Sequence, residues 1–264
     1  MNSIIVKDLK KTFTLSKKQM KINRTNDHLK VAIDGVSFET KAGEIFGLLG
    51  SNGAGKTTTL RCIATLIKPD EGEVTVEGIN IKDDLEIRKK IGFLTNELKL
   101  EEQFTPNYLF NYFAKFHNID NETNEKRKQE LFTRFGINEF SETKIGDLST
   151  GMKQKISIAI SLVHDPDIII FDEPTNGLDV ITAKVVTDYL QEMKEKGKTV
   201  VISTHIMSLV EKICDRVGII IDGKVKVCDT LENIKKMSSK NDLEDVFFQL
   251  YEKGEVSWKA LDIL

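Results

Sequence analysis

The stretch Gly50-Ser51-Asn52-Gly53-Ala54-Gly55-Lys56-Thr57-Thr58 has the pattern Gly-x-x-x-x-Gly-Lys-Thr, which is typical of a phosphate-binding loop. Residues 44–49 before it are apolar enough for a buried strand, and residues 57–64 after it suit the first turns of a helix. A strand, a glycine-rich turn and a helix N-terminus direct a row of backbone N–H groups at one point. The stretch therefore predicts a nucleoside-triphosphate site.

Each residue of this loop has an expected task. Gly50, Gly53 and Gly55 let the backbone curve round a phosphate without a clash from a Cβ atom. We expect Lys56 to reach the β- and γ-phosphates and the Thr57 hydroxyl to ligate Mg²⁺. The other loop residues that we expect around the phosphates are Ser51, Asn52, Ala54 and Thr58.

Composition narrows the classes of protein that fit. The chain has 264 residues, which is enough for one large α/β domain or two small ones. A net charge of -3 gives no general attraction to nucleic acid, so no nucleic-acid partner is expected. Cys62, Cys214 and Cys228 are widely separated, which favours buried, reduced thiols. No apolar stretch approaches the ~20 residues of a membrane-spanning helix, so at a membrane we expect another chain to supply the crossing.

Short, partly alternating segments around the loop predict an antiparallel sheet beside it. They lie at residues 4–6, 36–39 and 72–78. Residues 16–30, between the first two, are polar and carry several lysines. We interpret them as a solvated extension of a hairpin, with contact to a phosphate or a lipid headgroup as the alternative.

From about residue 97 to 165 the pattern predicts a helical subdomain. A helix should begin at Thr105-Pro106, and a second amphipathic helix should cover residues 125–135. Aromatic and aliphatic side chains recur along the first helix at a spacing of three or four residues. They are Tyr108, Leu109, Tyr112, Phe113 and Phe116. We expect this stripe in the subdomain core, although an exposed part of it could form a docking groove.

The last third of the sequence predicts a parallel sheet with helices on both faces. Apolar runs for buried strands lie at residues 168–171, 199–203 and 217–221, with helices at 182–196 and 206–214. The expected fold class is therefore α/β: a P-loop NTPase with a parallel core, an antiparallel β subdomain and a helical subdomain. We expect this domain over residues 1–236 and a helical tail over 237–264. In the tail, Asn241 and Glu244 have the spacing of a capping box.

Two carboxylates, Asp172 and Glu173, follow the apolar run at 168–171. We expect this strand beside the strand that feeds the phosphate-binding loop, so that Asp172 can hold Mg²⁺ directly or through water. Glu173 points differently and is expected to polarise the attacking water, an effect typically worth ~10²–10⁴ in rate. An acidic pair at a strand end is also a common surface feature, but the loop upstream favours the catalytic interpretation.

Leu148-Ser149-Thr150-Gly151-Met152 precedes a predicted helix at residues 153–163. Ser149 suits the N-cap position. The N–H groups at this helix start could bind a second anion, and a plain capped helix is the alternative.

Five motifs in this order resemble the ATP-binding cassette (ABC) ATPase family. They are the loop at 50–58, Leu-Ser-x-Gly at 148–151, Phe171-Asp172-Glu173-Pro174, Thr175-Asn176-Gly177-Leu178-Asp179 and Ser203-Thr204-His205. The resemblance covers residues 4–229 and implies an ATPase that uses ATP and Mg²⁺. It also implies a head-to-tail dimer of two copies, in which Ser149 and Gly151 face the γ-phosphate held by Lys56 of the other copy. His205 would contact the γ-phosphate and act with Glu173 in catalysis.

The resemblance places Phe13 against adenine and Asp179 at the dimer interface. Two departures from the family pattern are visible. Thr150 and Met152 stand where the family motif Leu-Ser-Gly-Gly-Gln has glycine and glutamine. Asn96 stands where we align a glutamine that touches Mg²⁺ and relays to the membrane subunit, and its stem is one methylene shorter.

Segments at residues 43–49, 64–69 and 91–95 resemble ATPase subunits of bacterial two-component exporters, the sodium-extruding type first and drug or antibiotic exporters next. This resemblance implies a peripheral subunit at the cytoplasmic face of the membrane. It would couple ATP-driven dimer closure to Na⁺ export through an integral membrane permease. The alternatives are a soluble ABC ATPase that acts on ribosomes or DNA, and a small-molecule kinase. Soluble ABC ATPases of the first kind normally carry tandem cassettes or a long coiled coil, and this sequence shows neither. The Leu-Ser-x-Gly segment argues against a small-molecule kinase.

Overall fold

The computed structural model describes residues 2–22, 25–95 and 100–254. Its larger sheet, within this part of the chain, consists of β3 (Ile45–Leu49), β6 (Ile91–Thr95), β7 (Ile168–Asp172), β8 (Thr199–Thr204), β9 (Arg216–Ile221) and β10 (Lys224–Thr230). The strand order is β10-β9-β3-β8-β7-β6, and all neighbours are parallel except β10 and β9. The predicted parallel core is therefore confirmed.

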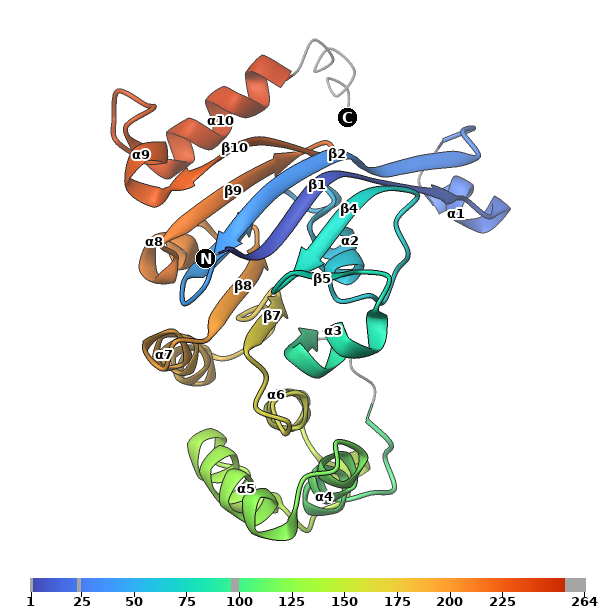
Figure 1. Cartoon of the computed structure of the whole chain (residues 1–264), viewed down its shortest axis with the longest axis vertical. Coiled ribbons are helices and arrows are strands. Elements are labelled where there is room, and N and C mark those ends of the chain that lie inside the picture. The colour runs from blue at the N-terminus through green and yellow to red at the C-terminus, as the bar shows by residue number, and fades with distance from the viewer. Residues whose placement is uncertain (1, 23–24, 96–99, 255–264) are drawn as a thin grey trace.

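The smaller sheet is antiparallel, as predicted. It is formed by β1 (Asn2–Thr14), β2 (Leu29–Lys41), β4 (Glu71–Val76) and β5 (Ile79–Asn80), in the order β2-β1-β4-β5. β1 and β2 are longer than the sequence pattern predicts, and their hairpin extends beyond the body of the molecule (Figure 1). α1 (Lys17–Ile22) lies in this extension and buries none of its residues. The solvated extension is therefore confirmed.

Nine further helices are described, some packed against the sheets and others gathered in the helical subdomain. They are α2 (Lys56–Ile63), α3 (Asp84–Lys90), α4 (Pro106–Phe116), α5 (Asn121–Phe135), α6 (Thr150–Ser161), α7 (Val180–Glu195), α8 (Met207–Ile213), α9 (Leu231–Lys235) and α10 (Leu243–Gly254). Two 3₁₀ turns lie at Asn138–Phe140 and Ile145–Asp147. Figure 1 shows α4, α5 and α6 gathered at one end of the molecule, as a helical subdomain requires. Within the described residues, none of the helices is long and apolar enough to span a bilayer.

The core lies on both faces of the six-stranded sheet. β7 illustrates the arrangement, because all five of its residues are buried and the first four alternate between two apolar clusters. Ile169 and Phe171 pack with the helical side, and Ile168 and Ile170 pack with α2 and the antiparallel sheet. Successive side chains of a strand point to opposite faces, so a continuous apolar run is what a sheet covered on both faces requires.

The predicted place of β7 in the sheet is wrong. β8 lies between β3 and β7, and it pairs with both. Apolar runs predict strands but carry no information about their lateral order, and β8 is as completely buried as β3 and β7. β6 was also not predicted as a strand.

Two smaller predictions need correction. The aromatic stripe on α4 is only partly core: Leu109 is buried, but Tyr108, Tyr112 and Phe116 are 50%, 54% and 72% exposed. In the tail, the Asp242 carboxylate, not Asn241, accepts the Glu244 N–H. The cysteines carry free thiols, with Cys62 and Cys214 buried and Cys228 half-buried.

Candidate nucleotide-binding site

The phosphate-binding loop connects β3 to α2 in a conformation that requires glycine. Gly55 has φ of 107°, and a Cβ atom there would lie 2.5 Å from the Ala32 carbonyl oxygen. At Gly50, a Cβ atom would lie 2.4 Å from the carbonyl oxygen of Ile220. β2 and β9 therefore press directly against the loop, which leaves no room for a side chain at either position.

Lys56 begins α2 and is buried, with 5% of its side chain exposed. Its ammonium donates hydrogen bonds to the carbonyl oxygens of Gly50 at 2.8 Å and Ser51 at 3.1 Å. The Nζ atom also lies 3.4 Å from Oε1 of Glu173. A buried ammonium held by two carbonyl oxygens of the phosphate-binding loop is placed to meet an anion there.

Thr57 and Asp172 come together although 115 positions separate them in the sequence. The Thr57 hydroxyl donates to Oδ1 of Asp172 at 3.1 Å, and the Ser203 hydroxyl on β8 also donates to this carboxylate. Hydroxyl and carboxylate oxygens are the donors that Mg²⁺ prefers, so these residues fit the metal. Asn96, the third expected ligand, lies outside the described residues.

Ser203 stands in one of the five motifs, but its contact with Asp172 was not predicted from the sequence. It pairs with Asp172 in the register of β7 and β8, and only the strand order reveals this neighbourhood. β8 thus connects the strand that ends at the loop with the strand that ends at the carboxylates.

Glu173 and His205 face each other across the ends of β7 and β8. Glu173 has φ of 53°, in the left-handed region, so its side chain departs from the line of the strand. Nδ1 of His205 lies 3.1 Å from each carboxylate oxygen of Glu173. This geometry assembles Lys56, Glu173 and His205 at one edge of the sheet.

A cavity of about 240 Å³ opens at the loop. Its lining consists of Phe13, Lys30, Ala32, Asn52, Gly53, Gly55, Lys56, Thr57, Thr58 and Glu173. The structure therefore brings Phe13, which the resemblance places against adenine, to the same cavity as the phosphate-binding loop. Lys30 and Ala32 were not predicted as lining residues, although the place of Lys30 opposite Phe13 in the β1–β2 hairpin could have indicated it.

Ser149 and Gly151 lie elsewhere, at the start of α6, and do not line this cavity. The Ser149 hydroxyl oxygen accepts the Met152 N–H at 3.3 Å, which confirms the predicted N-cap. Asp179 caps α7, where its carboxylate accepts the N–H groups of Ile181 and Thr182 at 3.0 Å. The Thr182 hydroxyl and N–H hold the pKa of Asp179 below its usual range.

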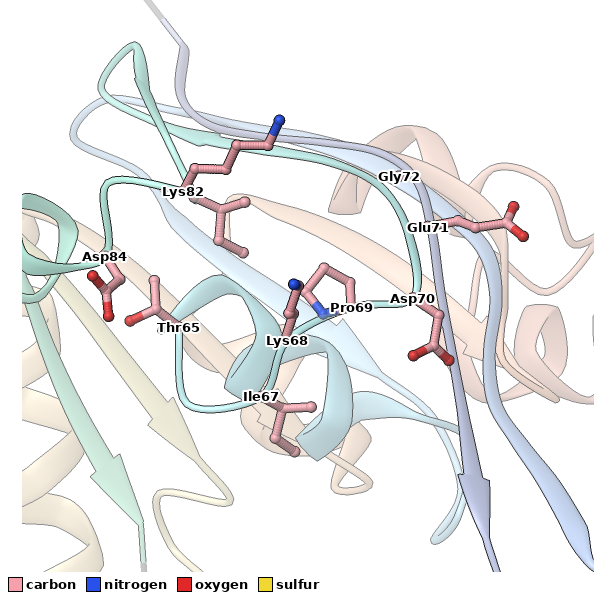
Figure 2. Close-up of a pocket in the computed structure, with 10 residues that line it drawn as sticks. Thr65, Ile67, Lys68, Pro69, Asp70, Glu71, Gly72, Lys82 and Asp84 are labelled. Carbon is pink, nitrogen blue, oxygen red and sulfur yellow. The ribbon is translucent and has the colours of Figure 1, made fainter.

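Figure 2 shows a second cavity, of about 490 Å³, beyond the C-terminal end of α2. The loop with Lys68 and Pro69 borders it, together with Lys82 and Asp84. No predicted site residue lines this cavity, so the candidate nucleotide site is the smaller cavity at the phosphate-binding loop.

Comparison with known proteins decides the family. The family model described as ABC transporter matches residues 33–176. This chain belongs to the ABC transporter family. As an ABC ATPase it is 37% identical, over 235 residues, to the "ABC transporter ATP-binding protein NatA" of Bacillus subtilis, which covers 88% of this chain and 96% of NatA. The "Linearmycin resistance ATP-binding protein LnrL" of the same organism is 37% identical over 197 residues, with 74% and 63% of the two chains covered.

Solved structures of ABC proteins agree. An "ATP binding subunit of ABC transporter" superposes with a TM-score of 0.82 and 27% identity, over 94% of this chain and 99% of that one. A dimeric ATP-binding cassette bound to ADP and Pi superposes with a TM-score of 0.74 and 28% identity, over 86% and 98% of the two chains. The predicted family, fold class and ATPase activity are therefore confirmed: this ABC ATPase binds and hydrolyses ATP.

Proposed function

We propose that this ABC ATPase is the energising subunit of a membrane exporter and that its cargo is Na⁺. The proposed cargo rests on the resemblance of residues 43–49, 64–69 and 91–95 to exporter ATPases of the sodium-extruding type, and the 37% identity to NatA over almost the full length of both chains supports it. A drug or antibiotic is the second candidate, because LnrL, named for linearmycin resistance, is equally identical over a shorter stretch.

ATP would occupy the cavity at the phosphate-binding loop, with adenine against Phe13 and the phosphates over the N-terminus of α2. Lys56 would exchange its bonds to two loop carbonyls for the β- and γ-phosphates. The backbone N–H groups of residues 50–58 would hold the same oxygens. This arrangement needs little movement, because the ammonium already lies within the loop.

The Thr57 hydroxyl and the Asp172 carboxylate would hold Mg²⁺, which neutralises phosphate charge when it is bound. Ser203 fixes the orientation of this carboxylate through its hydrogen bond. Glu173 would accept the proton of the water that attacks the γ-phosphorus, and ADP and inorganic phosphate would leave. His205, whose ring contacts Glu173, would bind the γ-phosphate beside the attacking water.

Two copies would close head to tail, with Ser149 and Gly151 of each completing the site of the other. The exposed location of Ser149, away from the cavity of its own chain, supports this proposal. The permease would dock on the helical subdomain, where Tyr108, Tyr112 and Phe116 expose an aromatic face on α4. Docking there would hold the protein at the cytoplasmic face of the membrane.

The test is reconstitution with the permease from the neighbouring reading frame. Co-expressed chains are purified together, placed in vesicles and supplied with external MgATP and external ²²Na⁺, so that the ATPase subunits that face the medium can drive transport into the vesicle. We expect ATP-dependent accumulation of ²²Na⁺ inside the vesicles, and no accumulation with the Glu173→Gln variant. ATP hydrolysis that linearmycin stimulates while no ²²Na⁺ accumulates would instead favour the antibiotic cargo. Failure of any membrane protein to co-purify would contradict the exporter proposal itself.

A further inference from the structure

Lys30 lines the nucleotide cavity, although it belongs to the polar segment that no family motif covers. It lies on β2, directly opposite Phe13 of β1 in the antiparallel register. Residues in such a pair have Cβ atoms about 5 Å apart on the same face of the sheet. Lys30 and Phe13 are therefore neighbours on the face that borders the cavity.

The position of β2 brings this lysine close to the phosphate-binding loop. Ala32, two residues further along β2, also lines the cavity, and its carbonyl oxygen limits the space at Gly55. Ala32 lies at a register shift of the β1–β2 ladder, because Thr12 pairs with Val31 and Lys11 with Ile33. Lys30 thus lines the same cavity as Phe13 and the loop that precedes α2.

The charges in the cavity leave Lys30 uncompensated. The charged lining residues are Lys30, Lys56 and Glu173, and the last two lie 3.4 Å apart as an ion pair. Lys30 has no ion-pair partner within the described residues. Lys11, which lies over the Phe13 ring, is paired with Asp70 at 2.7 Å and does not line the cavity.

From these observations we infer that Lys30 binds the α-phosphate of the nucleotide and determines its affinity. A lysine stem that starts beside the base can extend along the ribose to the first phosphate. Lys56 serves the β- and γ-phosphates at the other end of the cavity. This inference rests on the proposed position of ATP against Phe13 and the phosphate-binding loop.

The test measures the affinity of the full chain for ADP, AMP and adenosine, by competition against a fluorescent ADP analogue. Lys30→Gln is expected to weaken ADP and AMP by about 3- to 10-fold, since one charge-assisted contact is lost. Adenosine should bind unchanged because it has no phosphate. Lys30→Arg should restore ADP binding to within about 2-fold of the wild type. Lys18→Gln, on the exposed α1 of the same hairpin, removes the same charge outside the cavity and should change nothing.

Parallel measurements on Phe13→Ala and Lys56→Ala separate the role of Lys30 from the proposed position of ATP. If both weaken ADP while Lys30→Gln binds like the wild type, the role of Lys30 is wrong and the position of ATP stands. Equal weakening of adenosine and ADP by Lys30→Gln would also overturn the phosphate contact. If none of the three variants changes the affinity, the proposed position of ATP is wrong and the role of Lys30 falls with it.

Discussion

At the residue scale, Glu173 is constrained more than an ordinary strand-end carboxylate. It has a left-handed backbone, and its side chain lies between the Lys56 ammonium and the His205 ring. A side chain held from both sides can present one oxygen to a water molecule in a fixed direction, which is what general-base catalysis requires.

Glu173→Gln should therefore keep ATP binding and reduce phosphate release by about 10²–10⁴-fold, because the amide cannot accept the proton. With hydrolysis blocked, ATP should accumulate in a closed dimer. Phosphate release and light scattering with MgATP measure the two effects. Glu195→Gln, which changes an exposed carboxylate at the end of α7, is the control. Turnover near the wild-type rate would remove Glu173 as the base.

In the phosphate-binding loop, Gly55 is a second residue whose surroundings leave no room for substitution. Gly55→Ala should weaken ATP binding by more than about 10-fold, because the new Cβ atom meets the Ala32 carbonyl at 2.5 Å and must displace the loop. Gly78→Ala is the matched control, because Gly78 also has a positive φ, of 81°, but has no atom within 4 Å of the added carbon. Both variants should lose some thermal stability, and only the first should lose affinity for ATP.

At the scale of elements, His164 connects helices of the helical subdomain with the sheet. It follows α6, its ring stacks on His117 at the end of α4 with 4.3 Å between centroids, and its Nε2 lies 3.2 Å from the Ile91 carbonyl oxygen. Burial lowers the pKa of His164 to about 4, with the charges of His117 and Arg127 acting in the same direction and Asp165 opposing them. His117 also has a lowered pKa, because it is partly buried.

This arrangement predicts a loss of stability in mild acid. The folded pKa of His164 is below its ordinary value, so the unfolded chain binds the proton first. Its effect on stability should be absent above about pH 6.5 and should grow as the pH falls toward 4, to a loss on the order of 2–3 kcal/mol. Urea unfolding from pH 7 to 4 measures this slope. His164→Gln should flatten it, and His28→Gln, on the exposed hairpin, should leave it unchanged. Equal slopes in all three proteins would contradict the prediction.

The sequence predicted most of the individual strands and helices, but not the order of the strands in the sheet. The strand–loop–helix at residues 45–63 and the buried strands β7, β8 and β9 follow from local patterns, because glycine turns and apolar runs are local properties. The insertion of β8 between β3 and β7 does not, since many apolar strands can be neighbours. The same limit explains the site: Lys56, Thr57 and Glu173 have roles that follow from their motifs, whereas the place of Lys30 and the contact of Ser203 with Asp172 depend on cross-strand register.

At the scale of the whole molecule, Val180 and Ile181 are 86% and 78% exposed beside Asp179. Two adjacent large apolar side chains next to the predicted interface residue favour burial against a second copy. In a Glu173→Gln background, Ile181→Asp should reduce the ATP-dependent dimer by about 10-fold or more, because a carboxylate would be buried in the interface. Leu85→Asp, at a side chain on α3 that is 69% exposed, is the control. An undiminished dimer on size exclusion with light scattering would place the interface elsewhere.

The strand order also affects how the protein is made. β3 leaves the ribosome early, but its two neighbours in the sheet, β8 and β9, end at Thr204 and Ile221. Until these arrive, the nascent chain carries a fully apolar strand with both edges unpaired, a state prone to aggregation. The nucleotide site therefore cannot form during synthesis of the first two hundred residues. The strand that feeds the phosphate-binding loop therefore stays unpaired during synthesis for much longer than its early position in the chain suggests.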